Sequence, residues 1–173
     1  ADDVAVEADS GGHTDNRPLT ALFPSIRVLR DQMVRDHGYV RPIRLGAAGG
    51  IGTPDAAAAA YALGADFILT GSVNQACVES GLSETGRKLL CQAGLADVVM
   101  APAADMFEMG VEVQVLRRGT MFGVRARKLY ELYRAHPSLD AIPATERTQV
   151  EKMLKSSFDG AWASTRAFWM GRD

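Results

Sequence analysis

Two short glycine-containing segments carry the strongest chemical signal in the sequence. Gly49-Gly50-Ile51-Gly52 comes just before a helix start marked by Thr53 and Pro54, and Gly71-Ser72 follows a short apolar run. A dianionic phosphate needs several backbone N–H groups that converge on it, and glycine lets the backbone approach such a ligand closely. The two segments therefore predict a phosphate-binding site. Tight turns that hold no ligand are the alternative.

Other phosphate-binding motifs fit the sequence less well. Residues 46–52 do not match G-x-G-x-x-G, and no Asp or Glu follows at the end of the next strand to hold a ribose. This disfavours a Rossmann dinucleotide site. The sequence also lacks G-x-x-x-x-G-K-[ST], which excludes a P-loop.

His13 is the candidate catalytic side chain. It lies in a glycine-containing loop directly after an expected strand, whereas His37 and His136 fall at helix ends, where structural roles are expected. Loops after parallel strands form the active end of α/β proteins, and imidazole can donate a proton near neutral pH. A surface residue without a catalytic role is the alternative. No Cys or Ser stands out as the partner of a nucleophilic dyad, and no second histidine suggests a metal site.

Alternating strands and helices are expected to position these residues. Strands are predicted at residues 4–8, 43–48 and 66–69, and helices at residues 19–37 and 53–64, with Gly38 and Gly64 as stops. Strand–helix–strand spacing of this kind implies parallel strands joined by right-handed crossovers. The first part of the chain is therefore predicted to be an α/β unit with its loops at one edge.

The pattern becomes mainly helical after about residue 83. Helices are predicted at residues 83–96, 124–134, 145–155 and 158–169, with a short extended segment at 111–115. We therefore divide the chain into residues 1–82, an α/β unit with the predicted phosphate site, and residues 83–173, a mainly helical subdomain that could bind a substrate or a docking partner.

Two clusters in this second part each allow two interpretations. Flexible apolar side chains could line an acyl channel or simply pack a helical subdomain. Basic side chains could meet an acidic partner or form a solvated helix face. The apolar cluster comprises Met100, Met106, Phe107, Met109, Met121 and Phe122, and the basic cluster comprises Arg117, Arg118, Arg125, Arg127, Lys128 and Arg134.

Bulk composition excludes several classes of protein. The 173 residues are 47% hydrophobic and 23% charged, so a packed core is expected rather than disorder. A net charge of −2 gives no general attraction to nucleic acid or anionic membranes, and no apolar run is long enough to span a bilayer. Two cysteines, Cys77 and Cys91, suggest reduced core residues of a cytoplasmic protein rather than a disulfide framework.

The motifs around these residues resemble a known family. EADSGGHTDNRP (residues 7–18), GAAGGIGTP (46–54) and TGSVNQ (70–75) are similar to segments of the trans-acting enoyl reductases of polyketide and polyunsaturated fatty acid synthases. These enzymes belong to the 2-nitropropane dioxygenase (nitronate monooxygenase)-like flavin mononucleotide (FMN) barrels. PAADMFE (102–108) and RARKLYELY (125–133) in the tail also resemble the reductases and separate them from the nitronate enzymes.

The resemblance implies a flavoprotein oxidoreductase. FMN would be held by the backbone of Ala48, Gly49, Gly50, Gly71 and Ser72, and His13 matches the active-site histidine of the group. The implied reaction passes a hydride from NADPH through FMN to the β-carbon of an enoyl thioester on an acyl carrier protein, while a proton reaches the α-carbon. His13 would supply that proton or orient the thioester carbonyl. A homodimer is compatible with the resemblance.

The main departure from the family is length, because a complete (β/α)₈ TIM barrel needs about 250 residues. The resemblance places the three strands as the sixth to eighth, and the start at Ala1 suggests a cut through a larger protein. The remainder of the barrel would then be a partner, and this chain alone is expected to be inactive. A nitronate monooxygenase-type oxidase and a non-catalytic module that binds a carrier protein or a phosphate ligand remain the competing interpretations.

Overall fold

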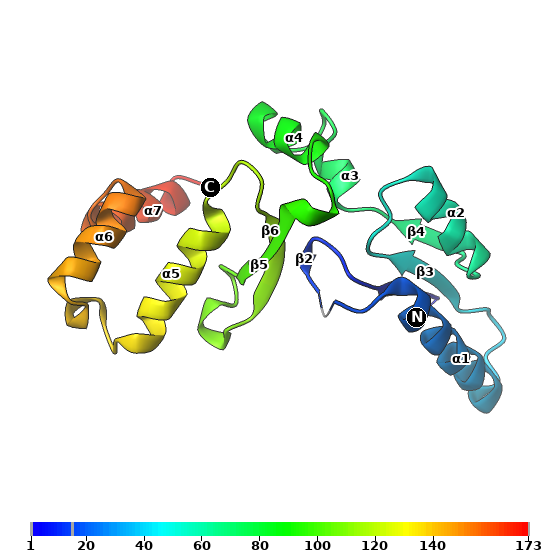
Figure 1. Cartoon of the computed structure of the whole chain (residues 1–173). Coiled ribbons are helices and arrows are strands. Elements are labelled where there is room, and N and C mark those ends of the chain that lie inside the picture. Colours follow the sequence, from blue (N-terminus) through cyan, green and yellow to red (C-terminus); the bar gives the residue numbers. More distant parts are fainter. Residues whose placement is uncertain (1, 15, 173) are drawn as a thin grey trace.

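The computed structural model describes residues 2–14 and 16–172 (Figure 1). Ala1, Asp15 of the segment 7–18 and Asp173 lie outside the described residues. A parallel sheet with its helices forms one end of the molecule, an antiparallel sheet lies in the middle, and three helices form the other end. The chain is therefore elongated, and its two sheets meet near β2.

The first sheet is parallel, as the sequence predicts. Its strands are β1 (Asp3–Glu7), β3 (Arg44–Ala48) and β4 (Phe67–Leu69), in the order β1-β3-β4. The connecting helices are α1 (Leu19–His37) and α2 (Pro54–Ala62). The predicted α/β class is confirmed, and the predicted bounds of these elements agree with the structure to within about two residues.

Local signals explain where these helices begin and end. Thr53 precedes α2 and its side chain accepts a hydrogen bond from the Ala56 amide, while Pro54 occupies the first helical position. Gly38 ends α1 in the left-handed conformation, with φ at 60°, and its amide donates to the Val34 carbonyl. Proline at the start of α2 and glycine after the end of α1 therefore act at the positions where the sequence places them.

One face of the parallel sheet packs on α1 and α2. The buried cluster contains Val6, Phe23, Leu45, Ala47, Ile51, Ala60 and Ala65. Phe23 and Leu45 are fully buried, and each contributes about 1.5–3 kcal/mol of hydrophobic stabilisation. On the opposite face the Phe67 ring lies over Gly46, where an added β-carbon would overlap the ring. Side chains that pack on both faces of the sheet thus fix the position of β3.

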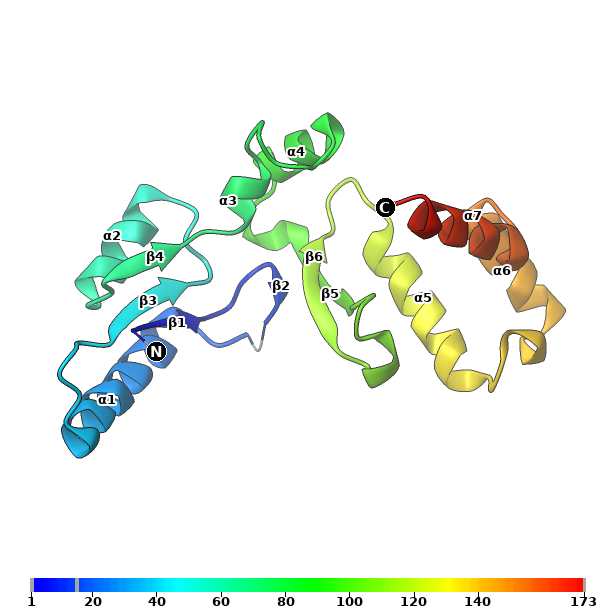
Figure 2. The same ribbon diagram turned by 180° about the vertical axis from the view of Figure 1, so that it is seen from behind.

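A second, antiparallel sheet joins the two parts of the chain. It consists of β2 (Gly12–His13), β6 (Glu112–Leu116) and β5 (Val98–Pro102), in the order β2-β6-β5. The extended segment predicted at residues 111–115 is β6, whereas β2 and β5 were not predicted. Figure 2 shows β2 beside β6 from the reverse side. His13 therefore lies in a short strand and not in a free loop, because β6 supplies a pairing partner that is distant in sequence.

The helices after residue 83 agree with the sequence in type. They are α4 (Glu84–Cys91), α5 (Phe122–Ala135), α6 (Ala144–Leu154) and α7 (Phe158–Met170), with one-turn 3₁₀ helices η1 (Leu95–Asp97), η2 (Phe107–Met109) and η3 (Leu139–Ala141). The predicted helix at residues 83–96 ends earlier, at Cys91, and the one-turn η1 follows. A separate small core of Leu132, Ile142 and Val150 holds α5 and α6 together.

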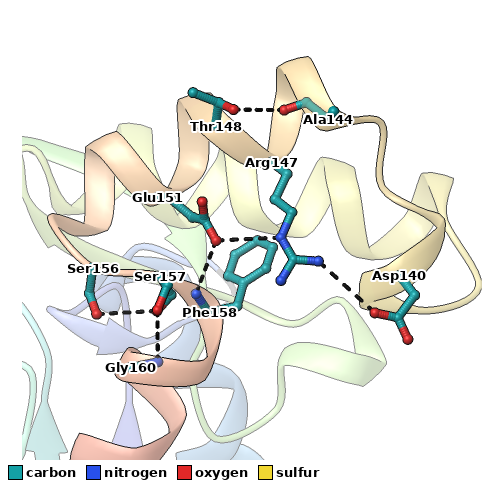
Figure 3. A network of polar contacts seen from close by, with 9 residues as sticks. All are labelled: Asp140, Ala144, Arg147, Thr148, Glu151, Ser156, Ser157, Phe158 and Gly160. Atoms are coloured by element: carbon teal, nitrogen blue, oxygen red, sulfur yellow. Dashed lines mark hydrogen bonds and ion pairs between the residues drawn. The ribbon is translucent and has the colours of Figure 1, made fainter.

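A polar network fixes the junction between α6 and α7 (Figure 3). The Glu151 carboxylate accepts from the Arg147 guanidinium at 3.4 Å and from the Phe158 amide at 3.3 Å. The guanidinium also lies 5.0 Å from the centre of the Phe158 ring. Ser157 caps α7 by accepting from the Gly160 amide at 3.0 Å. One side chain, Glu151, thus fixes the end of one helix against the start of the next.

The cysteines are exposed, so the expectation that they are core residues was wrong. Cys77 follows the one-turn helix α3 (Ser72–Gln75), and Cys91 is the last residue of α4. Neither helix buries a residue, because both are too short to cover a sheet face and they project beside the two sheets (Figure 1). Within the described chain, no helix has the length and apolar character needed to cross a membrane.

Candidate functional site

The carboxyl ends of the three parallel strands lie side by side. Glu7 is in register with Ala48, and Ala48 is in register with Leu69. The Ala48 carbonyl accepts a hydrogen bond from the Ala8 amide at 2.8 Å, which continues the ladder to the last residue of β3. The loops that follow β1, β3 and β4 therefore leave the sheet at one edge.

The two predicted glycine segments meet the His13 loop at this edge. A β-carbon on Gly49 would lie 2.6 Å from the Ala8 carbonyl oxygen, and one on Gly11 would lie 3.2 Å from the Ser72 hydroxyl oxygen. One on Gly52 would lie 3.8 Å from the Val73 side chain. These contacts link the segments after all three strands, so the structure brings Gly49, Gly50, Gly71 and Ser72 to one side of the sheet.

The backbone of these segments leaves several amides without a turn or loop hydrogen bond. Gly49 and Gly50 have φ values of 91° and 71°, a left-handed region that other residues rarely adopt. In the described part of the chain, none of the hydrogen bonds of turns and loops uses the amides of Gly49, Gly50, Gly71 or Ser72 as donors. A β-carbon on Gly71 would meet no protein atom within 4 Å. The segments thus offer free donors beside open space.

The amino-terminal edge of the same sheet is closed by side chains. The Asp66 carboxylate accepts from the Leu45 amide at 2.7 Å. The Arg44 guanidinium donates to both carboxylate oxygens of Asp3, at 2.7 and 2.8 Å. The hydrogen bond to Asp3, and then its negative charge, raise the pKa of Arg44 above its usual value. Stabilising contacts therefore gather at the edge opposite the glycine segments.

His13 is held by the pairing of β2 with β6 and by a polar loop. It lies in register with Val113, and Gly12 lies in register with Gln114. The Gln114 side-chain amide donates to Asp9 at 3.4 Å, and the Thr14 hydroxyl donates to the same oxygen at 3.1 Å. Asp9 therefore joins the edge of the parallel sheet to the antiparallel sheet.

The imidazole of His13 borders an open pocket and faces a carboxylate. The pocket has a volume of about 340 Å³ and is lined by Glu7, Ala8, His13, Thr14, Val111 and Glu112. The Nε2 atom of His13 lies 3.4 Å from Oδ2 of Asp105, and both side chains are more than half exposed. Asp105 was not predicted as a site residue, because its proximity to His13 depends on strand pairing across the two sheets.

Asp105 also lines a second pocket. It has a volume of about 360 Å³, and its lining includes Asp105, Met106, Phe107, Met109 and Tyr133. The Phe107 ring packs edge-on against Tyr130 at 5.3 Å. Two further methionines of the predicted apolar cluster, Met100 and Met121, do not line it. Met106, Phe107 and Met109 thus line a pocket, whereas Met121 and Phe122 are exposed, so the acyl channel stays a prediction.

Most of the predicted basic cluster is engaged within the chain. Arg118 pairs with Asp97 at 3.5 Å, Arg127 with Glu112 at 2.7 Å and Lys128 with Glu146 at 3.6 Å. Arg117 donates to the Ala96 carbonyl. The Gly94 amide, and more weakly Arg118, lower the pKa of Asp97 below its usual value. A free basic surface for an acidic partner is therefore smaller than the sequence suggests.

The described residues contain no group of three or more His, Cys, Asp or Glu side chains that could hold a metal ion. The candidate site therefore consists of backbone amides, one imidazole and the carboxylates around it. Backbone donors of this kind bind phosphate, and imidazole handles a proton.

The sequence is similar to parts of several synthase proteins, although no family model matches the chain. It is 50% identical over 99% of its length to a polyunsaturated fatty acid synthase protein of Thraustochytrium sp.. It is 55% identical over 87% of its length to polyketide biosynthesis protein ThaF of Burkholderia thailandensis, and 52% identical over 92% to PksE of Bacillus subtilis. The chain spans 12%, 13% and 21% of these three proteins.

Solved structures give a consistent result. The enoyl reductase domain of MlnA, from the macrolactin biosynthesis cluster of Bacillus amyloliquefaciens, matches 95% of the chain with a TM-score of 0.86 and 44% identity. The match covers 37% of that domain. FabK from Thermotoga maritima matches 89% of the chain and 40% of its own length, with a TM-score of 0.57 and 28% identity. Over nearly its whole length the chain is similar to polyketide and polyunsaturated fatty acid synthase proteins and to the enoyl reductase domain of MlnA, which confirms the family resemblance seen in its motifs.

Proposed function

We propose that this chain is a segment of an FMN-dependent enoyl reductase that reduces the carbon–carbon double bond of an enoyl thioester. The observation that supports the proposal is that the segments of Gly49-Gly50 and Gly71-Ser72 lie at the carboxyl ends of neighbouring strands beside the His13 loop, and that their amides make no turn or loop hydrogen bond in the described part of the chain. The likeness to the MlnA enoyl reductase domain supports the same reaction.

The residues at this edge fit a flavin phosphate. Gly49 and Gly50 have a left-handed backbone without side chains, which lets an anion approach the main chain closely, and a β-carbon on Gly71 would meet no protein atom within 4 Å. Ala48 ends β3 just before these amides. We therefore assign the phosphate to Ala48, Gly49, Gly50, Gly71 and Ser72. Bound FMN would supply the two-electron chemistry, with NADPH as its reductant.

His13 is assigned to the substrate side of this reaction. Its imidazole borders the pocket that opens next to Glu7 and Glu112, and it is more than half exposed. A thioester that enters the pocket meets an imidazole able to give a proton to the α-carbon or to hold the carbonyl oxygen. An acyl carrier protein is the proposed bearer of the thioester, in keeping with the synthase proteins that the chain matches.

We further propose that residues 1–82 are strands six to eight of a TIM barrel and that residues 83–173 form a substrate or docking subdomain. Within the described residues β1 pairs with β3 on one side only. Its other side is therefore open to pairing with strand five of the barrel. The two parts share the antiparallel sheet, because β2 of the first part pairs with β6 of the second. The rest of the barrel would complete the flavin site, so the segment alone is expected to be inactive.

The test uses the full-length protein that contains this chain. We expect the purified protein to show a visible flavin band, to release FMN on denaturation and to oxidise NADPH when given a crotonyl carrier-protein thioester. Absence of the flavin band, or bound FMN without thioester reduction, would contradict the proposal. Bound FMN with efficient oxidation of a nitronate instead would assign the protein to the nitronate monooxygenases. Tight carrier-protein binding without flavin would point to the non-catalytic module.

A further inference from the structure

We propose that Asp105 is a positioning residue that fixes the orientation and tautomer of the His13 imidazole; this inference rests on the proposed function. Nε2 of His13 and Oδ2 of Asp105 are 3.4 Å apart. That separation is longer than a tight hydrogen bond, as catalytic contacts often are in sites without substrate. The contact joins β2 to the loop after β5.

The fold brings the two side chains together through three adjacent strands. His13 is in register with Val113 of β6, and Pro102 at the end of β5 is in register with Glu112. Ala103, which is 1% exposed, donates its amide to the Val111 carbonyl at 2.9 Å. Asp105 follows this buried anchor by two residues, so its backbone is held close to the imidazole.

The other carboxylates that line the His13 pocket have different partners. Glu112 accepts from the Arg127 guanidinium at 2.7 Å. Glu7 accepts from the Ser10 hydroxyl at 3.2 Å. Among the described residues, Asp105 is the carboxylate that forms an ion pair with His13. The assignment of Asp105 therefore follows from the partner that each carboxylate contacts and not from its charge alone.

The contact with Asp105 gives the two nitrogens of the His13 ring different roles. Because the Asp105 carboxylate lies against Nε2, Nδ1 is the nitrogen left for the substrate. A protonated His13 transfers the Nδ1 proton to the α-carbon and becomes neutral with Nε2–H retained. Solvent then returns a proton to Nδ1, since the ring is accessible. Bound FMN would supply the electron pair for the β-carbon, with NADPH as its reductant.

The first test measures steady-state kinetics of the full-length protein with a carrier-bound enoyl thioester. Asp105→Ala should lower kcat about tenfold, with KM changed less than about twofold, because the imidazole is mispositioned while the thioester still binds. Asp105→Asn, whose amide oxygen still accepts from Nε2–H, should fall between wild type and Asp105→Ala. Asp140→Asn removes a carboxylate from an exposed ion pair with Arg147 in the helical region and should leave kcat unchanged.

A double-mutant cycle separates positioning from a general structural effect. Because Asp105 acts through His13, the double variant His13→Ala/Asp105→Ala should be as slow as His13→Ala alone. A double variant slower than His13→Ala by the full factor of Asp105→Ala would overturn the proposal. An Asp105→Ala protein with wild-type kcat would also overturn it. Bound FMN per protein, read from the visible spectrum, should stay constant across the series if the variants fold.

A chemical readout tests the contact independently of turnover. Diethyl pyrocarbonate acylates an imidazole nitrogen that is free of partners, and peptide mass spectrometry reports the rate at His13. Nδ1 is open to the reagent in the wild type, so Asp105→Ala should raise the rate by adding Nε2 as a second reactive nitrogen, whereas Asp140→Asn should not raise it. An unchanged rate would overturn the contact. If the wild-type protein lacks flavin and turnover but shows the acylation difference, the proposed function fails while the contact stands.

Discussion

The strands of the parallel sheet end differently at the two edges they define: the amino-terminal ends of the strands form one edge, and their carboxyl ends form the other. At the amino-terminal edge, the Leu45 amide has Asp66 as its acceptor and Arg44 makes two hydrogen bonds to Asp3. At the carboxyl edge, the amides of the two glycine segments make no turn or loop hydrogen bond in the described part of the chain. The same three strands thus have paired amides at their amino-terminal ends and unpaired amides in the segments that follow their carboxyl ends.

This difference separates stability from function within one sheet. Backbone donors without a protein acceptor contribute nothing to folding, whereas they can receive an external anion without first breaking a contact. Side chains that close the other edge hold the strands in register. In (β/α) barrels the carboxyl ends of strands carry ligand sites and the amino-terminal ends serve stability. Changes at the two edges should therefore have different consequences.

The largest expected effect is at Gly49. Gly49→Ala places a β-carbon 2.6 Å from the Ala8 carbonyl oxygen in a left-handed backbone, so the turn must shift. The backbone strain alone costs about 1–3 kcal/mol, and FMN per protein should fall below about a tenth of wild type. Gly81→Ala is the matched control, since its β-carbon meets no protein atom within 4 Å. Denaturant unfolding and the visible spectrum give both quantities, and full flavin retention by Gly49→Ala would contradict the account.

A substitution at the opposite edge should affect stability without affecting the flavin. Asp66→Ala removes the acceptor of the Leu45 amide, and a buried donor without an acceptor costs about 1–3 kcal/mol. Asp66→Asn keeps an acceptor and should lose less. We expect the folded fraction of Asp66→Ala to bind FMN with wild-type affinity, measured by flavin fluorescence quenching. A parallel loss of FMN affinity would show that the two edges are not separable.

Ser72→Ala should weaken FMN binding without changing the free energy of unfolding. Removal of one neutral hydrogen-bond donor costs about 0.5–1.5 kcal/mol, so Ser72→Ala should weaken FMN binding roughly 2- to 10-fold. Riboflavin, which lacks the phosphate, should bind wild type and Ser72→Ala equally well. Ser164→Ala on the exposed face of α7 serves as the control substitution. Equal weakening for FMN and riboflavin would place Ser72 away from the phosphate.

The smallest effect is expected at Arg44. Its ion pair with Asp3 is exposed on both sides, at 61% and 44%, and such pairs contribute less than about 1 kcal/mol. Arg44→Met should therefore lower the free energy of unfolding slightly, and the difference should shrink in high salt because the ion pair is screened. Flavin binding should not change. A salt-independent loss of several kcal/mol would show that Arg44 does more than pair with Asp3.

Local signals explain why the parallel sheet and its helices could be predicted. Thr53 and Pro54 start α2 and Gly38 ends α1 through interactions within a few residues of each. The glycine segments could be predicted as well, because a positive φ at Gly49 and Gly50 is a property of residue type and turn. That these segments lie together follows from parallel strands whose carboxyl ends share an edge.

Features that depend on distant pairing could not be predicted. β2 is two residues long and forms because β6 lies beside it, and β5 ends in a proline. The approach of Asp105 to His13 depends on both strand pairs and leaves no signal near either residue. Exposure of Cys77 and Cys91 depends on how little surface α3 and α4 cover, which a residue-type preference for burial does not report.

An experimental structure of the full-length protein with FMN tests the central claim most directly. We predict that phosphate oxygens lie about 2.7–3.2 Å from the amide nitrogens of Gly49, Gly50, Gly71 and Ser72, with the His13 imidazole on the same side of the sheet. A phosphate bound elsewhere, or an imidazole on the far side of the sheet from the flavin, would contradict it.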